Sequence, residues 1–114
     1  MKYYDEALMS GIRKALEDEI THWPGVTSRE MMGCLCYFRG KSFFAFLVTR
    51  GMVLTKLPPD DRKTLLRLMR AEPFEMAGRS VKTWVQVPLK KPSELSGVLP
   101  FVKRSYEGIS PGRT

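Results

Sequence analysis

Two cysteines, Cys34 and Cys36, are the residues of this sequence that could act as nucleophiles, redox centres or metal ligands. In an extended strand, side chains two residues apart point to the same side, so both thiols would lie on one face. A zinc site needs about four ligands, and the only histidine, His22, lies twelve residues before Cys34 in a different predicted element. We therefore expect two reduced cysteines in the core or on a sheet face, with a redox or metal-binding role as the alternative.

The other residues that could catalyse a reaction do not form a recognisable set. Catalysis commonly needs a nucleophile beside a base, a pair of carboxylates, or a metal. We expect His22 to be exposed or to cap a helix. Glu17, Asp18 and Glu19 are consecutive, so a helix would direct their side chains apart. The sequence therefore predicts a protein without enzymatic activity, cofactor or metal site.

Basic residues near an aromatic residue form one further pattern, around Trp84. Lys82, Trp84 and Gln86 would share one side of a strand, and Arg79 would lie in the adjoining turn. A tryptophan can stack on a base while arginine and lysine hold phosphates. Arg79, Lys82 and Trp84 are therefore candidate contacts to nucleic acid or a partner. The alternative is that Trp84 packs beneath a helix at the edge of the core.

The charge of the chain is compatible with an acidic partner. Its 19 basic and 12 acidic residues give a net charge of +7. Residues 1–57 carry 8 basic and 6 acidic groups, whereas residues 58–114 carry 11 and 6, so the excess lies in the second half. This balance permits attraction to phosphate backbones or acidic proteins. Solvation of helix faces is the simpler alternative, because no block of five like charges occurs.

The elements that would position these residues follow from apolar spacing. Tyr4, Leu8, Ile12, Leu16 and Ile20 recur every four residues and predict an amphipathic helix over residues 3–21. Three strands are expected next, over residues 30–38 with a bend at Gly33, 42–48 and 52–57. Short loops can join them as an antiparallel meander.

The second half predicts a helix, two strands and a final helical region. Prolines 58 and 59 and aspartates 60 and 61 open the helix, whose buried side would contain Leu65, Leu66, Leu68 and Met69. Strands follow over residues 74–76 and 81–87, and residues 92–106 would form two short helical pieces because Pro100 interrupts them. The order α-β-β-β-α-β-β-α suits a two-layer α+β fold with a five-stranded antiparallel sheet.

Length and composition indicate one globular domain. The 114 residues are 43% hydrophobic and 27% charged, close to the averages of soluble proteins. The longest apolar run, over residues 43–48, is far shorter than the ~20 residues that span a bilayer. No apolar stretch resembling a secretory signal follows the N-terminus. We expect a domain over residues 1–107, a flexible tail over 108–114, and a cytoplasmic location without membrane contact.

Several short segments in a constant order resemble the TfoX N-terminal domain family. Residues 26–33 resemble its V-T-x-R-x-M-F-G-G-x-G segment through Arg29, Met31 and Gly33, with Met32 in place of the usual phenylalanine. Cys34 and Cys36 stand where the family usually has glycines. Further matches are residues 44–45, 54–57, 59–62, 72–74 and 84–88, and the similarity covers residues 4–106.

The resemblance implies a two-layer α+β domain of the kind also found in secretion chaperones, and a link to bacterial competence regulation. It supplies no catalytic residues, and Arg29, Met31 and Gly33 would be structural. We therefore expect a non-enzymatic interaction or regulatory module, related to transcription or competence, that acts through protein contacts and can form a homodimer. Direct nucleic-acid binding through the basic second half is the alternative.

Overall fold

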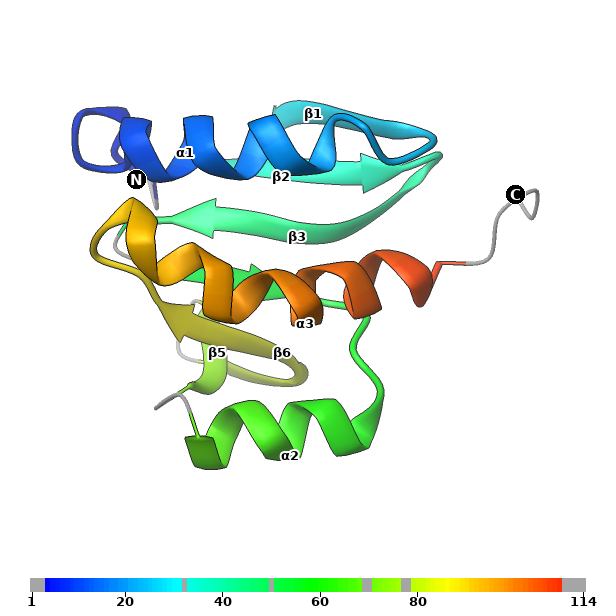
Figure 1. Ribbon diagram of the computed structural model, residues 1–114. Helices are drawn as coiled ribbons and strands as arrows, with labels where there is room; N and C mark the ends of the chain where they lie inside the picture. The colour runs from blue at the N-terminus through cyan, green and yellow to red at the C-terminus, as the bar shows by residue number, and fades with distance from the viewer. Residues whose placement is uncertain (1–3, 32, 50, 69–70, 77–78, 110–114) are drawn as a thin grey trace.

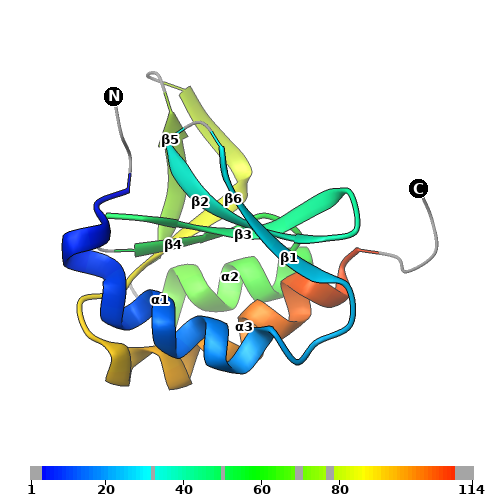
Figure 2. The ribbon, with the colours of Figure 1, turned by 90° about the horizontal axis from the view of Figure 1, so that it is seen from above.

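A computed structural model describes residues 4–31, 33–49, 51–68, 71–76 and 79–109, apart from the side chains of Leu68, Met76, Arg79, Ser80 and Lys82. Over these residues, six antiparallel strands form one sheet, and three α-helices lie on one of its faces (Figures 1 and 2). The predicted α+β class is confirmed, and the predicted count of five strands is one too few.

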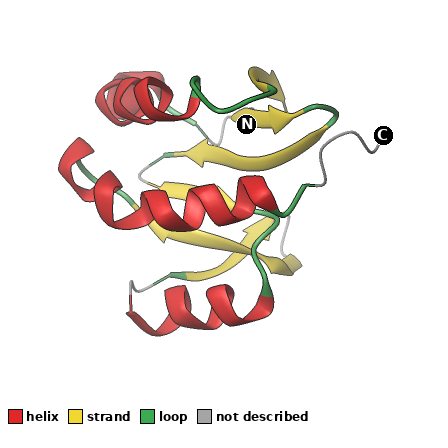
Figure 3. Cartoon of the chain, turned by 45° about the vertical axis from the view of Figure 1, so that its right-hand side comes forward, coloured by secondary structure: helices red, strands yellow, loops and turns green. Residues whose placement is uncertain are grey.

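The elements and their order in the sheet are as follows. The first half of the chain contains helix α1 (Glu6–Ile20) and strands β1 (Val26–Met31), β2 (Cys34–Arg39), β3 (Ser42–Val48) and β4 (Gly51–Leu54). Helix α2 (Pro59–Leu68) and strands β5 (Glu72–Met76) and β6 (Arg79–Pro88) follow. The chain then forms the short 3-10 helix η1 (Pro92–Glu94) and helix α3 (Leu95–Glu107). The strands lie in the order β1-β2-β3-β4-β6-β5. Figures 1 and 3 show α3 crossing the middle of the sheet, between α1 and α2.

The additional strand arises at Gly33, where the sequence predicts only a bend. Met31 pairs with Cys34, so the chain reverses direction between these two residues. Gly33 has a φ of +76°, a left-handed conformation that glycine adopts without a steric penalty and that short hairpin loops require. The single strand expected over residues 30–38 is therefore two strands, and the first begins at Val26.

The helix-covered face holds the larger of two apolar clusters, the helix-side core. It contains Met9, Ile12, Leu16 and Ile20 of α1, Val98, Val102 and Tyr106 of α3, and Phe44, Leu47, Met52, Val85 and Val87 of the sheet, among others. The prediction that Leu8 belongs to it is wrong: Leu8 is 53% exposed and Met9 is 1% exposed. Residues four apart on a helix differ by about 40° in direction. Counted back from Ile20, the third such step reaches Leu8, whose side chain therefore no longer faces the core.

Helix α2 begins at Pro59 as expected, but only part of its predicted apolar side is buried. Leu65 is fully buried, whereas Leu66 is 40% exposed. Consecutive helical residues differ by about 100° in direction, so one core contact does not serve both leucines. The side chain of Leu68 and all of Met69 lie outside the described part of the chain.

The expected break at Pro100 is wrong, because α3 runs through this residue from Leu95 to Glu107. Proline removes the bond that its N–H would donate to the carbonyl four residues earlier, at Ser96. Ser96 and Pro100 are both exposed, so this carbonyl lies on the solvent side of the helix. The first of the two expected pieces is instead η1.

Beyond α3, Gly108 and Ile109 are in contact with the domain. The Gly108 amide donates to the carbonyl oxygen of Arg104 at 3.0 Å, and Arg39 Nη1 donates to the Ile109 carbonyl at 3.0 Å. Residues 110–114 of the predicted tail lie outside the described residues.

The opposite, helix-free face carries a second cluster of apolar side chains. Its buried members are Cys34, Cys36, Phe38, Phe46, Val48, Val53 and Phe74, and Met31, Phe43 and Trp84 lie partly buried against it. The cluster is covered because the sheet bends. Strands β5 and β6 pair Pro73 with Val85 but Phe74 with Val81, and such an irregularity bends and twists a strand. Figure 2 shows the β5–β6 hairpin projecting on the side away from the helices.

A bulge in β3 determines which of its side chains belong to each apolar cluster. Tyr37 pairs with Ala45 and Phe38 with Phe43, which leaves Phe44 unpaired. As a result Phe44 and Ala45 both belong to the helix-side core, whereas Phe43 and Phe46 belong to the second cluster. The Phe44 carbonyl accepts hydrogen bonds from the Thr55 amide (3.1 Å) and from Ser105 Oγ of α3 (2.5 Å). This bulge therefore anchors the last helix to the sheet.

Candidate protein-interaction surface

Strand β1 is the most exposed strand of the sheet whose side chains are described throughout. It lies at one edge and pairs only with β2. Thr27, Ser28, Arg29 and Glu30 are all exposed, and only the two end residues are partly buried. The strand contains no proline, and its polar stretch places charges only at Arg29 and Glu30. Proline and charge are the usual means of protecting an edge, so β1 is lightly protected.

The hydrogen-bond pattern determines which backbone groups of β1 face outward. The Gly40 amide donates to the Gly25 carbonyl at 3.3 Å, so position 25 faces β2. Because antiparallel residues alternate between facing a partner strand and facing away, Thr27, Arg29 and Met31 also face β2. The amides and carbonyls of Ser28 and Glu30 therefore point away from the sheet, and no backbone group of the described residues bonds to them there. An extended chain could pair with them.

A hollow of about 310 Å³ lies beside this edge, lined by Thr27, Ser28, Arg29, Phe38, Gly40 and Lys41. The Arg29 guanidinium carbon lies 4.8 Å from the centre of the Phe38 ring, and Arg29 Nη2 lies 3.9 Å from the Met31 sulfur. These contacts place the cation on the helix-free side of β1, where Phe38 and Met31 belong to the second cluster. The lining residues include two cations and no carboxylate, so the hollow favours an anionic group.

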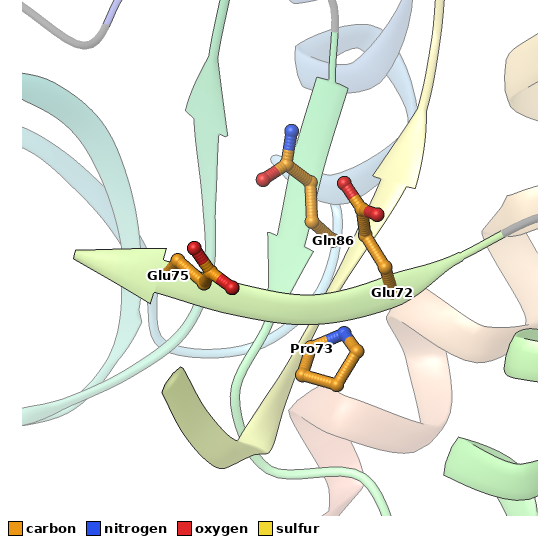
Figure 4. A pocket seen from close by; sticks show the side chains of 4 residues that line it. All are labelled: Glu72, Pro73, Glu75 and Gln86. Carbon is orange, nitrogen blue, oxygen red and sulfur yellow. The ribbon is translucent and has the colours of Figure 1, made fainter. Parts of the chain in front are cut away.

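The opposite edge, β5, differs in chemistry. Glu72, Pro73, Glu75 and Gln86 line a hollow of about 290 Å³ there (Figure 4). The two glutamates and Gln86 lie on one side of β5 in this view. Pro73 has no amide hydrogen to offer an added strand, and charged side chains further discourage pairing. The hollows at the two edges of the sheet therefore carry opposite charge, and β5 is the better protected edge.

Of the residues predicted to contact nucleic acid or a partner, the structure places the side chain of Trp84. Its ring packs in the second cluster, with ring centres 5.5 Å from Phe43, 5.6 Å from Phe46 and 6.2 Å from Phe74. Trp84 is therefore part of an aromatic cluster on the helix-free face and does not lie beneath a helix. The backbones of Arg79 and Lys82 belong to β6, and their side chains lie outside the described part of the chain.

The three residues of the family resemblance lie together at the β1 edge. Arg29 lines the hollow, Met31 packs against the second cluster, and Gly33 forms the loop that turns β1 into β2. Arg29 thus has an exposed, charged position in addition to the structural role expected for it.

The cysteines are buried in the second cluster, as predicted, and neither forms a disulfide. Burial raises the pKa of Cys34 to about 11, with a further contribution from Cys36. Burial also raises the pKa of Cys36, although Arg29 opposes this. Both thiols are therefore protonated near neutral pH, which is unfavourable for a nucleophile or a metal ligand.

The remaining polar residues do not assemble a recognised site. His22 is exposed, as one of the two alternatives predicts. The residues that the structure describes include no group of three or more His, Cys, Asp or Glu side chains suited to holding a metal ion. Glu17, one of the three consecutive acidic residues, accepts a hydrogen bond from the Tyr37 hydroxyl at 2.9 Å.

Most of the β1 surface is not recognisable from the sequence. Thr27, Ser28, Phe38 and Lys41 all line the hollow, yet only Arg29 is singled out beforehand, through the family resemblance. The signal that could have identified it is the polar stretch from Thr27 to Glu30. It lacks the alternation of apolar residues typical of a half-buried strand, but it can form an edge strand.

Comparison with family models, with curated proteins and with solved structures finds no match to this chain. Among the described residues, no helix combines the length and the apolar character needed to span a membrane.

Proposed function

We propose that this protein is a non-enzymatic interaction module that binds an extended polypeptide segment as an added strand along β1. One observation carries the proposal: the backbone amides and carbonyls of Ser28 and Glu30 point away from the sheet, at an exposed edge without proline. In this mode of recognition, main-chain hydrogen bonds supply affinity and side-chain pockets supply selectivity. The hollow at Arg29 lies where such a pocket is needed.

The chemistry of the described residues supports binding more than catalysis. The thiols of Cys34 and Cys36 are buried, and their raised pKa values disfavour the reactive thiolate. A catalytic site also needs convergent groups around a reacting atom, whereas the β1 hollow contains cations, hydroxyls and one aromatic ring.

The regulatory part of the proposal rests on the resemblance to the TfoX N-terminal domain family. Under this proposal the bound segment belongs to a cytoplasmic protein of transcription or competence control. The segment of the resemblance that contains Arg29, Met31 and Gly33 forms β1 and the start of its hairpin, so the resemblance and the exposed edge concern the same surface.

Removing a single outward amide tests the proposal. The Ser28 amide is not used by the β1–β2 pairing, so Ser28→Pro removes a donor from the edge while leaving the ladder bonds. Ser28→Ala, which keeps the amide, is the matched control. The probe is a fluorescein-labelled peptide of about ten alternating valine and threonine residues with glutamates near both ends, titrated by fluorescence anisotropy.

We expect saturable binding to the parent protein and to Ser28→Ala, and binding weakened at least about tenfold by Ser28→Pro. Circular dichroism of all three proteins establishes that they remain folded. A peptide N-methylated at consecutive residues loses the donors on both of its edges and should not bind. Equal binding by Ser28→Pro and the parent protein would exclude strand addition.

A second candidate function is direct nucleic-acid binding on the helix-free face. The observation that favours it is the position of Lys56 Nζ, 5.7 Å from the centre of the partly exposed Phe43 ring, which contacts Trp84. Exposed aromatic rings beside cations can bind single strands. This candidate predicts that labelled single-stranded DNA or RNA binds at low salt, that binding weakens steeply with salt, and that Arg79→Ala and Lys82→Ala weaken it. Absence of binding at low salt would eliminate it.

A further inference from the structure

We propose that the segment added to β1 is acidic on one side, with carboxylates that face Arg29 and Lys41 in the adjoining hollow. This inference rests on the proposed function, because it names the chemistry of the segment that the β1 edge binds. It concerns the side chains of that segment, whereas strand addition itself concerns only its backbone.

The Arg29 guanidinium can bind a carboxylate because, unlike most other described arginines, it donates to no oxygen atom of the described chain. Its contacts are the face of the Phe38 ring and the Met31 sulfur. By contrast, Arg13, Arg39, Arg62 and Arg104 each donate to an oxygen atom of the protein. A guanidinium stacked on an aromatic ring still presents its edge donors, and the planar fork matches a carboxylate.

Lys41 adds a second positive charge to the same hollow. It is exposed in the loop between β2 and β3 and lines the hollow together with Arg29. No ion pair joins either residue to a carboxylate of the described chain. An anionic side chain placed between them would therefore gain two favourable interactions without displacing an existing ion pair.

The other side of β1 has the opposite preference. Side chains alternate along a strand, so Glu30 lies on the helix-covered side of β1 while Arg29 lies on the helix-free side. A carboxylate of the added strand that faced Glu30 would be repelled. The segment should therefore carry its acidic residues at alternate positions, with neutral or basic residues between them.

A second copy of this chain is the less favourable occupant of the edge. Of the two edges of its sheet, β5 carries carboxylates in the described hollow, and there Pro73 has no amide hydrogen and lies between two glutamates (Figure 4). Strand addition through β5 would lose one main-chain hydrogen bond in a strand of five residues. A separate acidic segment is free of this restriction.

Three labelled peptides test the inference, each of about ten residues with valine or threonine at alternate positions. The intervening positions carry glutamate in the first peptide, glutamine in the second and lysine in the third. Fluorescence anisotropy is measured at low and at high salt, with the parent protein, with Arg29→Gln and with Lys41→Gln. Lys63→Gln, which removes an exposed cation on α2, is the matched control for net charge.

We expect the glutamate peptide to bind at least about tenfold more tightly than the lysine peptide at low salt, and high salt to reduce this ratio. Arg29→Gln should reduce the ratio by about tenfold, whereas Lys63→Gln should leave it unchanged. Charge reversal with Arg29→Glu should favour the lysine peptide.

The contrary outcomes separate the two proposals. Equal binding of all three peptides, lost in Ser28→Pro, would overturn acidic selection and leave strand addition in place. Absence of binding by every peptide would overturn both. A dimer detected by light scattering and disrupted by Ser28→Pro would assign the edge to a second copy and overturn the acidic segment.

Discussion

Ser105 is a buried polar residue whose hydroxyl joins three parts of the chain. Its Oγ donates to the Phe44 carbonyl at the β3 bulge (2.5 Å) and accepts from the Lys56 amide (3.0 Å). Strand β3 supplies the carbonyl, which also accepts from the Thr55 amide, α3 supplies the hydroxyl, and the segment after β4 supplies the amide. One side chain therefore connects α3 through hydrogen bonds to the backbone of β3 and to the backbone of the segment after β4.

Ser105→Ala is expected to lower the free energy of unfolding by about 1–3 kcal/mol, because it leaves a buried carbonyl and an amide without this partner. Urea denaturation followed by circular dichroism measures the change. Ser96→Ala removes an exposed hydroxyl from the same helix and should change stability by less than about 0.5 kcal/mol. Equal effects of the two substitutions would contradict the role assigned to Ser105.

The pKa of Cys34, raised to about 11 by burial, predicts how stability depends on pH. An unfolded thiol ionises near pH 8.5, so between about 8.5 and 11 the folded protein binds more protons than the unfolded chain. Stability from the buried thiol is then fully present below this window and is lost as pH rises through it. Cys34→Ala should therefore show a shallower alkaline loss of stability.

Urea midpoints between neutral pH and pH 11 measure this loss for the parent protein and for Cys34→Ala. Tyr4 and Tyr37, whose pKa values burial also raises, are present in both proteins, so the comparison isolates the thiol. Identical pH dependence in the two proteins would show that Cys34 is not protected. A thiol reagent near pH 8 should also label the cysteines slowly in buffer and rapidly in urea.

Helix α2 allows a test of one apolar position against its neighbour. Leu65→Ala should cost about 2–5 kcal/mol because Leu65 is fully buried in the helix-side core. Leu66→Ala removes the same atoms from a side chain that is 40% exposed and should cost less than about 1.5 kcal/mol. Thermal unfolding of both variants measures the difference. Comparable costs would contradict the burial of Leu65 and the exposure of Leu66.

Elements with strong local signals can be predicted from the sequence. The apolar spacing of α1, the proline and aspartates that open α2, and the apolar residues of β3 indicate these elements correctly. The prediction fails where a tertiary contact or one backbone angle decides. Gly33 completes a hairpin in place of a bend, and α3 continues past Pro100 because the helix packs on the sheet.

The candidate surface is harder to predict for the same reason. The polar stretch from Thr27 to Glu30 shows no alternation, so residues 26–29 are not recognised as strand. Only pairing with β2, which is a tertiary property, makes it an edge. The prediction correctly places Trp84 in a strand. The irregularity between β5 and β6, which directs their hairpin to the helix-free face, depends on the pairing register of the two strands. The sequence pattern does not specify this register.

At the scale of the whole molecule, two apolar clusters share one sheet. Trp23 packs with Phe44 and Tyr106 beside the helix-side core, whereas Trp84 packs in the second cluster. Strand β3 contributes Phe44 to one and Phe46 to the other, so neither cluster can come apart without disturbing the strand between them. Small domains usually unfold in one transition.

Single-tryptophan variants test this coupling. With Trp23→Phe, fluorescence reports on Trp84, and with Trp84→Phe it reports on Trp23, because the chain has two tryptophans. In each variant, urea unfolding followed by fluorescence should have the same midpoint as unfolding followed by circular dichroism. A fluorescence transition of Trp84 that precedes the loss of secondary structure would show that the second cluster unfolds separately.

The bulge at Phe44 also determines when a newly synthesised chain can reach its native state. Besides the Thr55 amide, its carbonyl bonds to a hydroxyl that lies 61 residues later in the sequence. All six strands precede α3 in the chain, so they are synthesised before the helix that bonds to this carbonyl. Completion of the fold is thus postponed until translation has released Ser105.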